Sequence, residues 1–166
     1  MEQLPMANLK HEIKQKTPFS GLEEEAFLNL VRTSDFLQRA FQQKTRPWGV
    51  TSTQYNILRI LRGARPDGLQ CAAIGARMIT AEPDITRLLA RLKSLKLIKQ
   101  HRDPSDRRVV WTQISESGRK LLSEMDPLIR RMPASLLGHL TKGELTQLIR
   151  LLELARLPCP NAALPE

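Results

Sequence analysis

Hydrophobic residues recur every three or four positions in the first part of the chain, with polar residues between them. Over residues 22–44 the apolar positions are Phe27, Leu30, Val31, Leu37 and Phe41. This spacing is typical of an amphipathic helix. Ser20 is followed three residues later by Glu23, the spacing of a capping box at a helix start. We therefore expect a long helix within residues 18–45, preceded by a flexible, irregular arm at residues 1–17.

Two further helices are expected after a break at residues 45–49, which read TRPWG. The first of them begins after Thr51 or Ser52, because both residue types are good N-caps. It ends near Gly63. The second is a short apolar helix at residues 71–78.

A longer helix is expected after a three-residue turn at residues 79–81. Thr80 is a suitable N-cap, Pro83 is tolerated in a first helical turn, and Glu82 and Asp84 suit the positive end of the helix dipole. The residues expected to face the core are Ile85, Leu88, Leu89, Leu92 and Leu95. The basic residues left on the outer surface are Arg87, Arg91 and Lys93.

Two extended runs, residues 97–102 and 109–114, predict a β-hairpin. The segment between them reads Asp-Pro-Ser-Asp, a combination typical of turns. The second run contains Val, Trp, Thr and Ile, which favour strands. Residues 69–70 offer only a very short additional strand.

Two helices are expected after the hairpin. The first covers residues 116–137, and Pro127 should kink or divide it, because proline lacks the N–H that a helix interior needs. The second covers residues 142–157, because Thr141 and Glu144 have capping-box spacing before a Leu-rich run.

These elements predict a mainly α-helical fold with one small β-hairpin. A short helix, a tight turn and a longer helix form a helix-turn-helix unit, and the hairpin that follows makes it a winged helix. We expect this lobe at residues 46–115, flanked by dimerisation helices at residues 18–45 and 116–157. The tail at residues 158–166 is rich in Pro and Ala and is expected to be disordered.

Positive charge is concentrated in the predicted helix-turn-helix and hairpin. Between Arg87 and Arg108 there are eight Lys or Arg and two acids, a net +6 of the whole chain's +9. A helix with arginines along one side, followed by a basic hairpin, is suited to a polyanion. The pattern therefore indicates duplex DNA as the partner, and the alternative is a charged surface that only aids solubility.

The sequence resembles the MarR-type bacterial transcriptional regulators. The resemblance rests on EPDITRLLARLKSLKLI, then DPSDRRVV and SESG, and the family's Asp-x-Arg wing signature falls on residues 106–108. It covers about residues 22–157. It implies a triangular homodimer that regulates transcription, as a repressor in our expectation, from a pseudo-palindromic operator. Small phenolic or other aromatic ligands often release such regulators from DNA.

The resemblance also assigns DNA-contacting positions. Those at the recognition helix are Thr80, Glu82, Pro83, Asp84, Thr86, Arg87 and Arg91. Those at the hairpin are Arg102, Asp106, Arg107 and Arg108, with Asp106 able to orient an arginine. Three positions depart from the family: Lys96 replaces a usual Gly, Ser115 replaces Thr at an N-cap, and Gln100 replaces a basic residue. Lys96 must therefore adopt a left-handed conformation at some cost, or the helix must end differently.

The terminal helices carry more leucine than one packed face requires. Burial against a second subunit is the simplest solution, and a thick intramolecular core is the alternative. The residues expected at the dimer interface are Phe27, Leu30, Leu145, Leu148 and Leu152. A ligand pocket near the dimer helices, implied by the resemblance, would be lined by Trp48, Tyr55 and Met125, whose alternative role is in the core.

Other classes of function find little support. His11, His101 and His139 are scattered and no Gly-rich phosphate loop exists, so we expect no enzyme. Cys71 and Cys159 suit neither a disulfide framework nor a metal site, and we expect no metal or cofactor, with Cys71 a small buried apolar residue. No apolar stretch suits a signal or a membrane span, so a cytoplasmic location is expected. The alternative function is a winged-helix module that binds protein or RNA without operator specificity.

Overall fold

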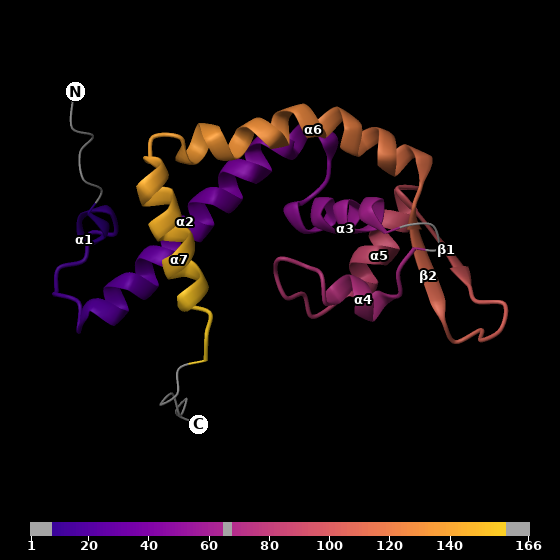
Figure 1. Cartoon of the computed structure of the whole chain (residues 1–166), viewed down its shortest axis with the longest axis horizontal. Coiled ribbons are helices and arrows are strands. Elements are labelled where there is room, and N and C mark those ends of the chain that lie inside the picture. The colour runs from indigo at the N-terminus through magenta and orange to yellow at the C-terminus, as the bar shows by residue number, and fades with distance from the viewer. Residues whose placement is uncertain (1–7, 65–67, 159–166) are drawn as a thin grey trace. The chain divides into compact units, whose positions relative to one another are not determined.

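The computed structural model describes residues 8–64 and 68–158. The chain divides into two compact units, residues 1–126 and 127–166. The first unit contains α1 (Leu9–Glu12), α2 (Leu22–Thr45), the 3₁₀ turn η1 (Arg46–Trp48), α3 (Ser52–Gly63), α4 (Cys71–Gly75), α5 (Ile85–Ser94), β1 (Ile98–Arg102) and β2 (Val110–Ile114). Helix α6 (Glu116–Leu137) continues from the first unit into the second, which adds α7 (Lys142–Leu154) (Figure 1). The predicted fold, mainly α with one hairpin, is confirmed.

The N-terminal segment contains a helical turn that the sequence pattern did not predict. Helix α1 begins after Asn8, whose side chain accepts a hydrogen bond from the His11 N–H at 3.3 Å. Leu9 is buried, and Glu12 pairs with Arg32 of α2 at 3.4 Å. The expectation of irregular chain is therefore wrong over residues 9–12, while residues 1–7 lie outside the described residues.

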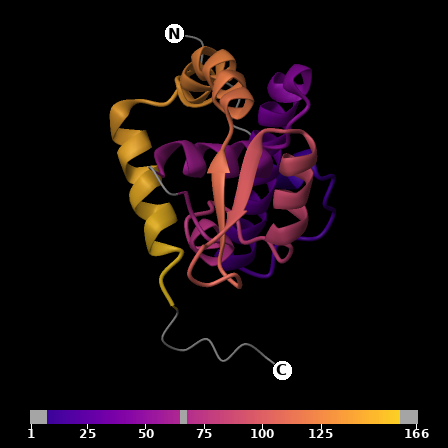
Figure 2. The same ribbon diagram turned by 90° about the vertical axis from the view of Figure 1, so that its right-hand side faces the viewer.

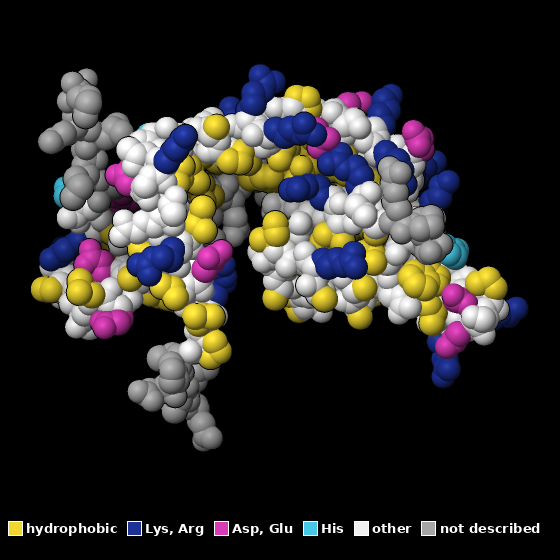
Figure 3. All heavy atoms as spheres, viewed as in Figure 1, with side chains coloured by type: hydrophobic (Ala, Val, Ile, Leu, Met, Phe, Trp, Pro, Cys, Tyr) yellow, Lys and Arg dark blue, Asp and Glu magenta, His cyan; other side chains and the backbone are white. Residues whose placement is uncertain are grey.

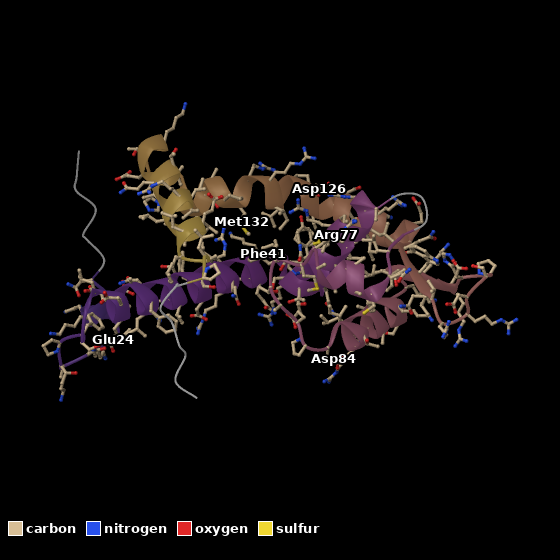
Figure 4. All side chains as sticks on the ribbon, turned by 60° about the horizontal axis from the view of Figure 1, so that its bottom comes forward. Glu24, Phe41, Arg77, Asp84, Asp126 and Met132 are labelled. Atoms are coloured by element: carbon tan, nitrogen blue, oxygen red, sulfur yellow. The ribbon has the colours of Figure 1, made fainter. Side chains whose placement is uncertain are left out.

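Helix α2 begins one residue away from the predicted capping pair. Gly21 is the N-cap, and the backbone N–H and hydroxyl of Ser20 both donate to Glu24 Oε2, at 2.6 and 2.8 Å. Glu24, labelled in Figure 4, therefore takes the role expected of Glu23. These hydrogen bonds lower the pKa of Glu24. The helix ends at Thr45, which confirms the predicted break at residues 45–49, and the break consists of η1 followed by a left-handed Gly49 (φ 65°).

The core of the first unit is built from the apolar faces of α3, α4, α5, the hairpin and the start of α6. Its most deeply buried apolar side chains are Ile57, Leu58, Leu61, Ile74, Leu92, Leu122 and Met125. Helix α3 begins after Thr51, one of the two predicted N-caps, and the Thr51 side chain forms a capping box that was not predicted, in which Thr51 and Gln54 each accept a hydrogen bond from the other's backbone N–H. Burial of each large apolar side chain contributes about 1.5–3 kcal/mol before entropy is counted. This core holds α5 and the hairpin in fixed positions.

The hairpin has an antiparallel register in which Ile98 faces Ile114 and Arg102 faces Val110. Leu69 adds a single bridge to Thr112, as expected of so short a segment. Figure 2 looks onto the hairpin and shows α5 beside it. The two strands therefore lie next to the helix that the sequence predicts to read DNA.

The end of α5 is a Schellman motif, in which Lys96 has φ 59°. The Leu97 N–H donates to the Leu92 carbonyl at 3.0 Å, and the Lys96 N–H donates to the Lys93 carbonyl at 2.9 Å. Lys96 thus adopts the left-handed conformation expected where the family has glycine, at a cost of about 1–2 kcal/mol. Leu95, at the C-cap, is exposed rather than directed inward, which corrects that expectation.

Helix α6 starts as predicted, because Ser115 Oγ accepts a hydrogen bond from the Gly118 N–H at 3.0 Å. Gly118 lies so close to the Leu97 carbonyl that a side chain there would displace the backbone. The helix is continuous through Pro127, so it is not divided there, and the alternative of a kink stays a prediction.

In the second unit, Thr141 and Glu144 form the predicted capping box of α7, and the helix ends at Leu154 rather than at residue 157. Of the tail expected to be disordered, residues 159–166 lie outside the described residues. No helix among the described residues is both long and apolar enough to cross a membrane.

Candidate nucleic-acid interface

The start of α5 differs from the sequence prediction. Asp84, rather than Thr80, is the N-cap, and its Oδ1 accepts the Arg87 N–H at 2.9 Å. The connection from α4 is therefore longer than the predicted three-residue turn, because α4 ends at Gly75 and α5 begins at Ile85. A cap at Thr80 would place Glu82 in the helix directly before Pro83, and a residue before proline is disfavoured in the helical region.

The α4–α5 loop is attached to α3 by two hydrogen bonds. Thr53 Oγ1 donates to Glu82 Oε1, and the Ile79 N–H donates to Asn56 Oδ1, each at 3.1 Å. Glu82 is half-buried and directed to α3, so the structure gives it a role in holding the loop. Thr80 and Pro83 are exposed in the same loop. Neither α3 residue was predicted as part of the site, and nothing in their spacing marks them.

The outer face of α5 presents two arginines. Leu89 and Leu92 are buried against the core, whereas Thr86, Arg87 and Arg91 are exposed. Neither arginine side chain makes an ion pair with any described residue. Asp84 lies at the start of the same helix (Figure 4). Two free guanidinium groups on one exposed helix face are suited to phosphates or to guanine edges.

The wing tip contains the predicted pairing of Asp106 with an arginine. Arg108 Nε donates to Asp106 Oδ1 at 3.1 Å, and one terminal nitrogen donates to Oδ2 at 3.3 Å. The hydrogen bonds from Arg108 lower the pKa of Asp106. Arg102 and Arg107 are exposed beside this pair, and Figure 3 shows Lys and Arg side chains around the hairpin tip.

A cleft of about 830 Å³ is lined by residues of α4, α5 and the hairpin. Its walls include Cys71 of α4, Leu89 and Lys93 of α5, and Gln100 and Arg108 of the hairpin. Cys71 is half-exposed, which corrects the expectation of a buried apolar residue. Gln100, which replaces a basic residue, donates a hydrogen bond to Thr112 Oγ1 at 3.3 Å.

The residues predicted for a ligand pocket lie elsewhere. Tyr55 and Met125 are buried, and Trp48 is half-buried in η1. The Tyr55 ring contacts Phe41 of α2, with 5.4 Å between ring centroids. Phe41 lies near the C-terminal end of α2 and is labelled in Figure 4. None of the three predicted residues lines the cleft between α5 and the hairpin. Their ligand role stays a prediction.

The residues predicted for a dimer interface are partly exposed. On α2, Phe27 is 63% exposed and Leu30 is 42% exposed. On α7, Leu148 is 36% exposed, while Leu145 and Leu152 are half-buried. Figure 3 shows hydrophobic side chains at the surface over α7.

The winged helix-turn-helix, with exposed arginines on its second helix and its wing, defines a class of DNA-binding protein. A family model described as MarR family matches residues 48–109. The HTH-type transcriptional repressor NicR of Pseudomonas putida is 34% identical over 112 residues, which cover 68% of this chain and 70% of NicR. The chain belongs to the MarR family and is a DNA-binding transcriptional regulator.

Two solved structures are similar over most of the chain. The crystal structure of a MarR transcription factor from Planctomyces limnophilus is 39% identical, with a TM-score of 0.63, and covers 82% of this chain and 99% of its own. BpsR of Bordetella bronchiseptica, whose DNA binding is regulated by 6-hydroxynicotinic acid, is 26% identical, with a TM-score of 0.70 and coverage of 80% and 98%. NicR and the Planctomyces limnophilus protein are transcriptional regulators, which confirms the expectation that the chain is not an enzyme.

Proposed function

We propose that the protein is a homodimeric repressor that binds a pseudo-palindromic operator, in the cytoplasm where bacterial DNA lies. The observation that carries this proposal is the pairing of two basic elements on one lobe. Arg87 and Arg91 are free on α5, and Arg108 is oriented by Asp106 on the wing. Helix α5 would enter the major groove, and the wing would contact the backbone or the adjacent minor groove.

The homodimer is supported by the exposed apolar side chains of α2 and α7. Phe27 is 63% exposed. Removing such a large apolar side chain from water lowers the free energy, so a dimer that buries it is stabilised. A twofold dimer also provides two recognition helices about 34–36 Å apart, one turn of DNA. The two half-sites of a palindrome have the same spacing.

Repression and release by a ligand are supported by the relatives. NicR is a repressor, and the DNA binding of BpsR is regulated by 6-hydroxynicotinic acid, a small aromatic acid. We propose a small aromatic effector for this chain, with Trp48, Tyr55 and Met125 in its pocket. Because Tyr55 and Met125 are buried, this pocket would have to open between α3 and its neighbours before a ligand could enter.

Selection of genomic fragments tests the operator. Sheared DNA from the source genome is incubated with the purified full-length protein, and the retained fragments are sequenced. We expect a shared inverted repeat, whose half-sites are about ten base pairs apart from centre to centre. Transcription from a promoter that carries the repeat should fall when the protein is added.

Retention of all fragments without a shared motif would contradict operator specificity. Preference for RNA over duplex DNA would favour the alternative of an RNA-binding winged helix. An increase in transcription would contradict repression while leaving operator binding intact.

A further inference from the structure

The wing contains a hydrogen-bond arrangement that neither the family signature nor the charge pattern explains. Trp111 lies on β2, opposite His101. Its indole N–H donates to Asp103 Oδ2 at 2.9 Å. The other oxygen, Oδ1, accepts from the Ser105 N–H at 2.8 Å, from the Ser105 hydroxyl, and from the Asp106 N–H at 3.2 Å. The Asp103 carboxylate therefore joins a strand to the turn at the hairpin tip.

The same arrangement continues to the exposed arginine of the wing. The backbone N–H and the guanidinium of Arg108 both donate to the Asp106 carboxylate. Arg108 is 92% exposed, and such a side chain ordinarily samples many rotamers. We refer to Trp111, Asp103, Ser105, Asp106 and Arg108 as the wing network.

We propose that Trp111 and Asp103 are positioning residues for DNA binding. Through the turn they hold Asp106, and thereby Arg108, in the orientation that meets the DNA backbone. This inference rests on the proposed function, because it assigns a role within the same DNA-binding surface. Neither residue needs to contact DNA itself.

The chemistry of the two side chains suits this role. The indole N–H of tryptophan is a donor with no acceptor function, so it can satisfy a carboxylate without competing for the N–H groups of the turn. A carboxylate accepts several hydrogen bonds at once. Holding an arginine in advance reduces the rotamer entropy that binding would otherwise remove, and a free arginine side chain has more of this entropy than most residues.

A substitution at Asp103 distinguishes the effect of charge alone from the effect of the wing network, because the two predict opposite changes in DNA affinity. Asp103→Asn removes a negative charge from a surface that faces phosphates, so electrostatics alone predicts tighter binding. The wing network predicts weaker binding, because the amide group of Asn cannot accept from all four donors. Glu116→Gln is the matched control, since Glu116 is exposed near the hairpin and gives up the same charge without breaking a hydrogen bond to a described residue.

A second substitution isolates the indole N–H. Trp111→Phe retains an aromatic ring but lacks the donor, and the Arg108→Ala background described below is its control. Binding is measured by fluorescence anisotropy on a labelled mixed-sequence duplex of about 30 base pairs, roughly three turns of DNA. We expect Asp103→Asn and Trp111→Phe to weaken binding about threefold to tenfold, and Glu116→Gln to leave it within about twofold.

The Arg108→Ala background separates positioning from general damage to the fold. If Trp111 acts through Arg108, Trp111→Phe should change binding very little when Arg108 is already absent. Equal effects in both backgrounds would overturn the proposal, as would tighter or unchanged binding of Asp103→Asn. The Trp48→Phe protein has Trp111 as its only tryptophan, so a change in its emission on adding Asp103→Asn reports the indole contact without DNA.

Binding of the unsubstituted protein to duplex DNA tests the proposed function separately from the positioning role. If it does not bind duplex DNA, the DNA-binding function fails and this role fails with it. If it binds while all wing variants bind equally well, only the positioning role fails.

Discussion

Arg62 of α3 and Asp126 of α6 form a two-point ion pair, with nitrogen–oxygen distances of 2.8 and 3.1 Å. Both side chains are largely shielded from water, and the hydrogen bond to Asp126 raises the pKa of Arg62. Planar two-point pairs of this kind are stronger than single contacts. The pair ties the first part of α6 to α3, within the first unit.

We expect Asp126→Asn to destabilise the protein by about 1–3 kcal/mol, because the Arg62 charge would remain without its partner in a shielded position. Arg39→Ala serves as the control, since its pair with Asp35 on α2 is largely exposed and should contribute less than about 0.5 kcal/mol. Urea unfolding followed by circular dichroism measures both. Equal destabilisation in the two variants would show that the Arg62 pair is no stronger than a surface pair.

Replacement of Lys96 by glycine should stabilise the protein. Its φ of 59° is unfavourable for a side chain, and Lys96→Gly should stabilise the protein by about 1 kcal/mol. Lys93→Gly, three residues earlier inside α5, should instead destabilise by a similar amount, about 1 kcal/mol. A thermal unfolding midpoint that falls in both variants would contradict the cost assigned to Lys96.

Hydrophobic spacing and capping residues predicted most helices and strands of this fold. They failed at the start of α5, where two residues close in sequence can both cap a helix. The N-cap of α3 and the capping box of α7 are local features, which the sequence reveals without knowledge of the fold. At α5, Thr80 was expected to be the N-cap and Asp84 only to suit the helix dipole. The conformational restriction that Pro83 places on the preceding residue favours Asp84 as the cap, and this signal was available in the sequence.

Contacts between distant residues could not be predicted in the same way. The bond from Thr53 to Glu82 joins residues 29 apart in the chain, and no spacing rule identifies it. Trp111 was recognised only as a strand former, since its contact with Asp103 depends on how the hairpin turns and which rotamer the indole adopts. The wing pair of Asp106 and Arg108 was predicted, because the two residues are nearly adjacent and belong to a family signature.

The loop before α5 should depend on its attachment to α3. Thr53→Val removes the hydroxyl that donates to Glu82 and should weaken operator binding about threefold to tenfold, because one anchor of the loop and of the start of α5 is removed. Glu82→Gln keeps an oxygen acceptor for that hydroxyl and should retain or slightly improve binding. A larger decrease for Glu82→Gln than for Thr53→Val would instead indicate that the carboxylate contacts DNA directly.

Arg87 and Arg107 should differ in what they recognise. Arg87→Ala on the recognition helix should cost about 1–3 kcal/mol mainly on the cognate operator, if the side chain pairs with a base edge as proposed. Arg107→Ala on the wing should weaken binding to all duplexes and reduce the salt slope by about 0.9 for each phosphate that is no longer neutralised. Titrations at several salt concentrations on operator and mixed-sequence DNA measure both. Equal weakening on the two DNAs for Arg87→Ala would reassign it to the phosphate backbone.

The apolar face of α7 should hold two subunits together. Leu148→Glu places a charge on a partly exposed apolar position, and burial of that charge at an interface would cost several kcal/mol. We expect this variant to be monomeric or unfolded, and to bind the operator far more weakly, because one half-site alone contributes too little.

Gln147→Glu is the matched control, since Gln147 is an exposed polar neighbour on the same helix and receives the same new side chain. Light scattering at micromolar concentration and circular dichroism distinguish a monomer from an unfolded chain. If the unsubstituted protein is a well-folded monomer that still binds its operator tightly, the proposed dimer is wrong.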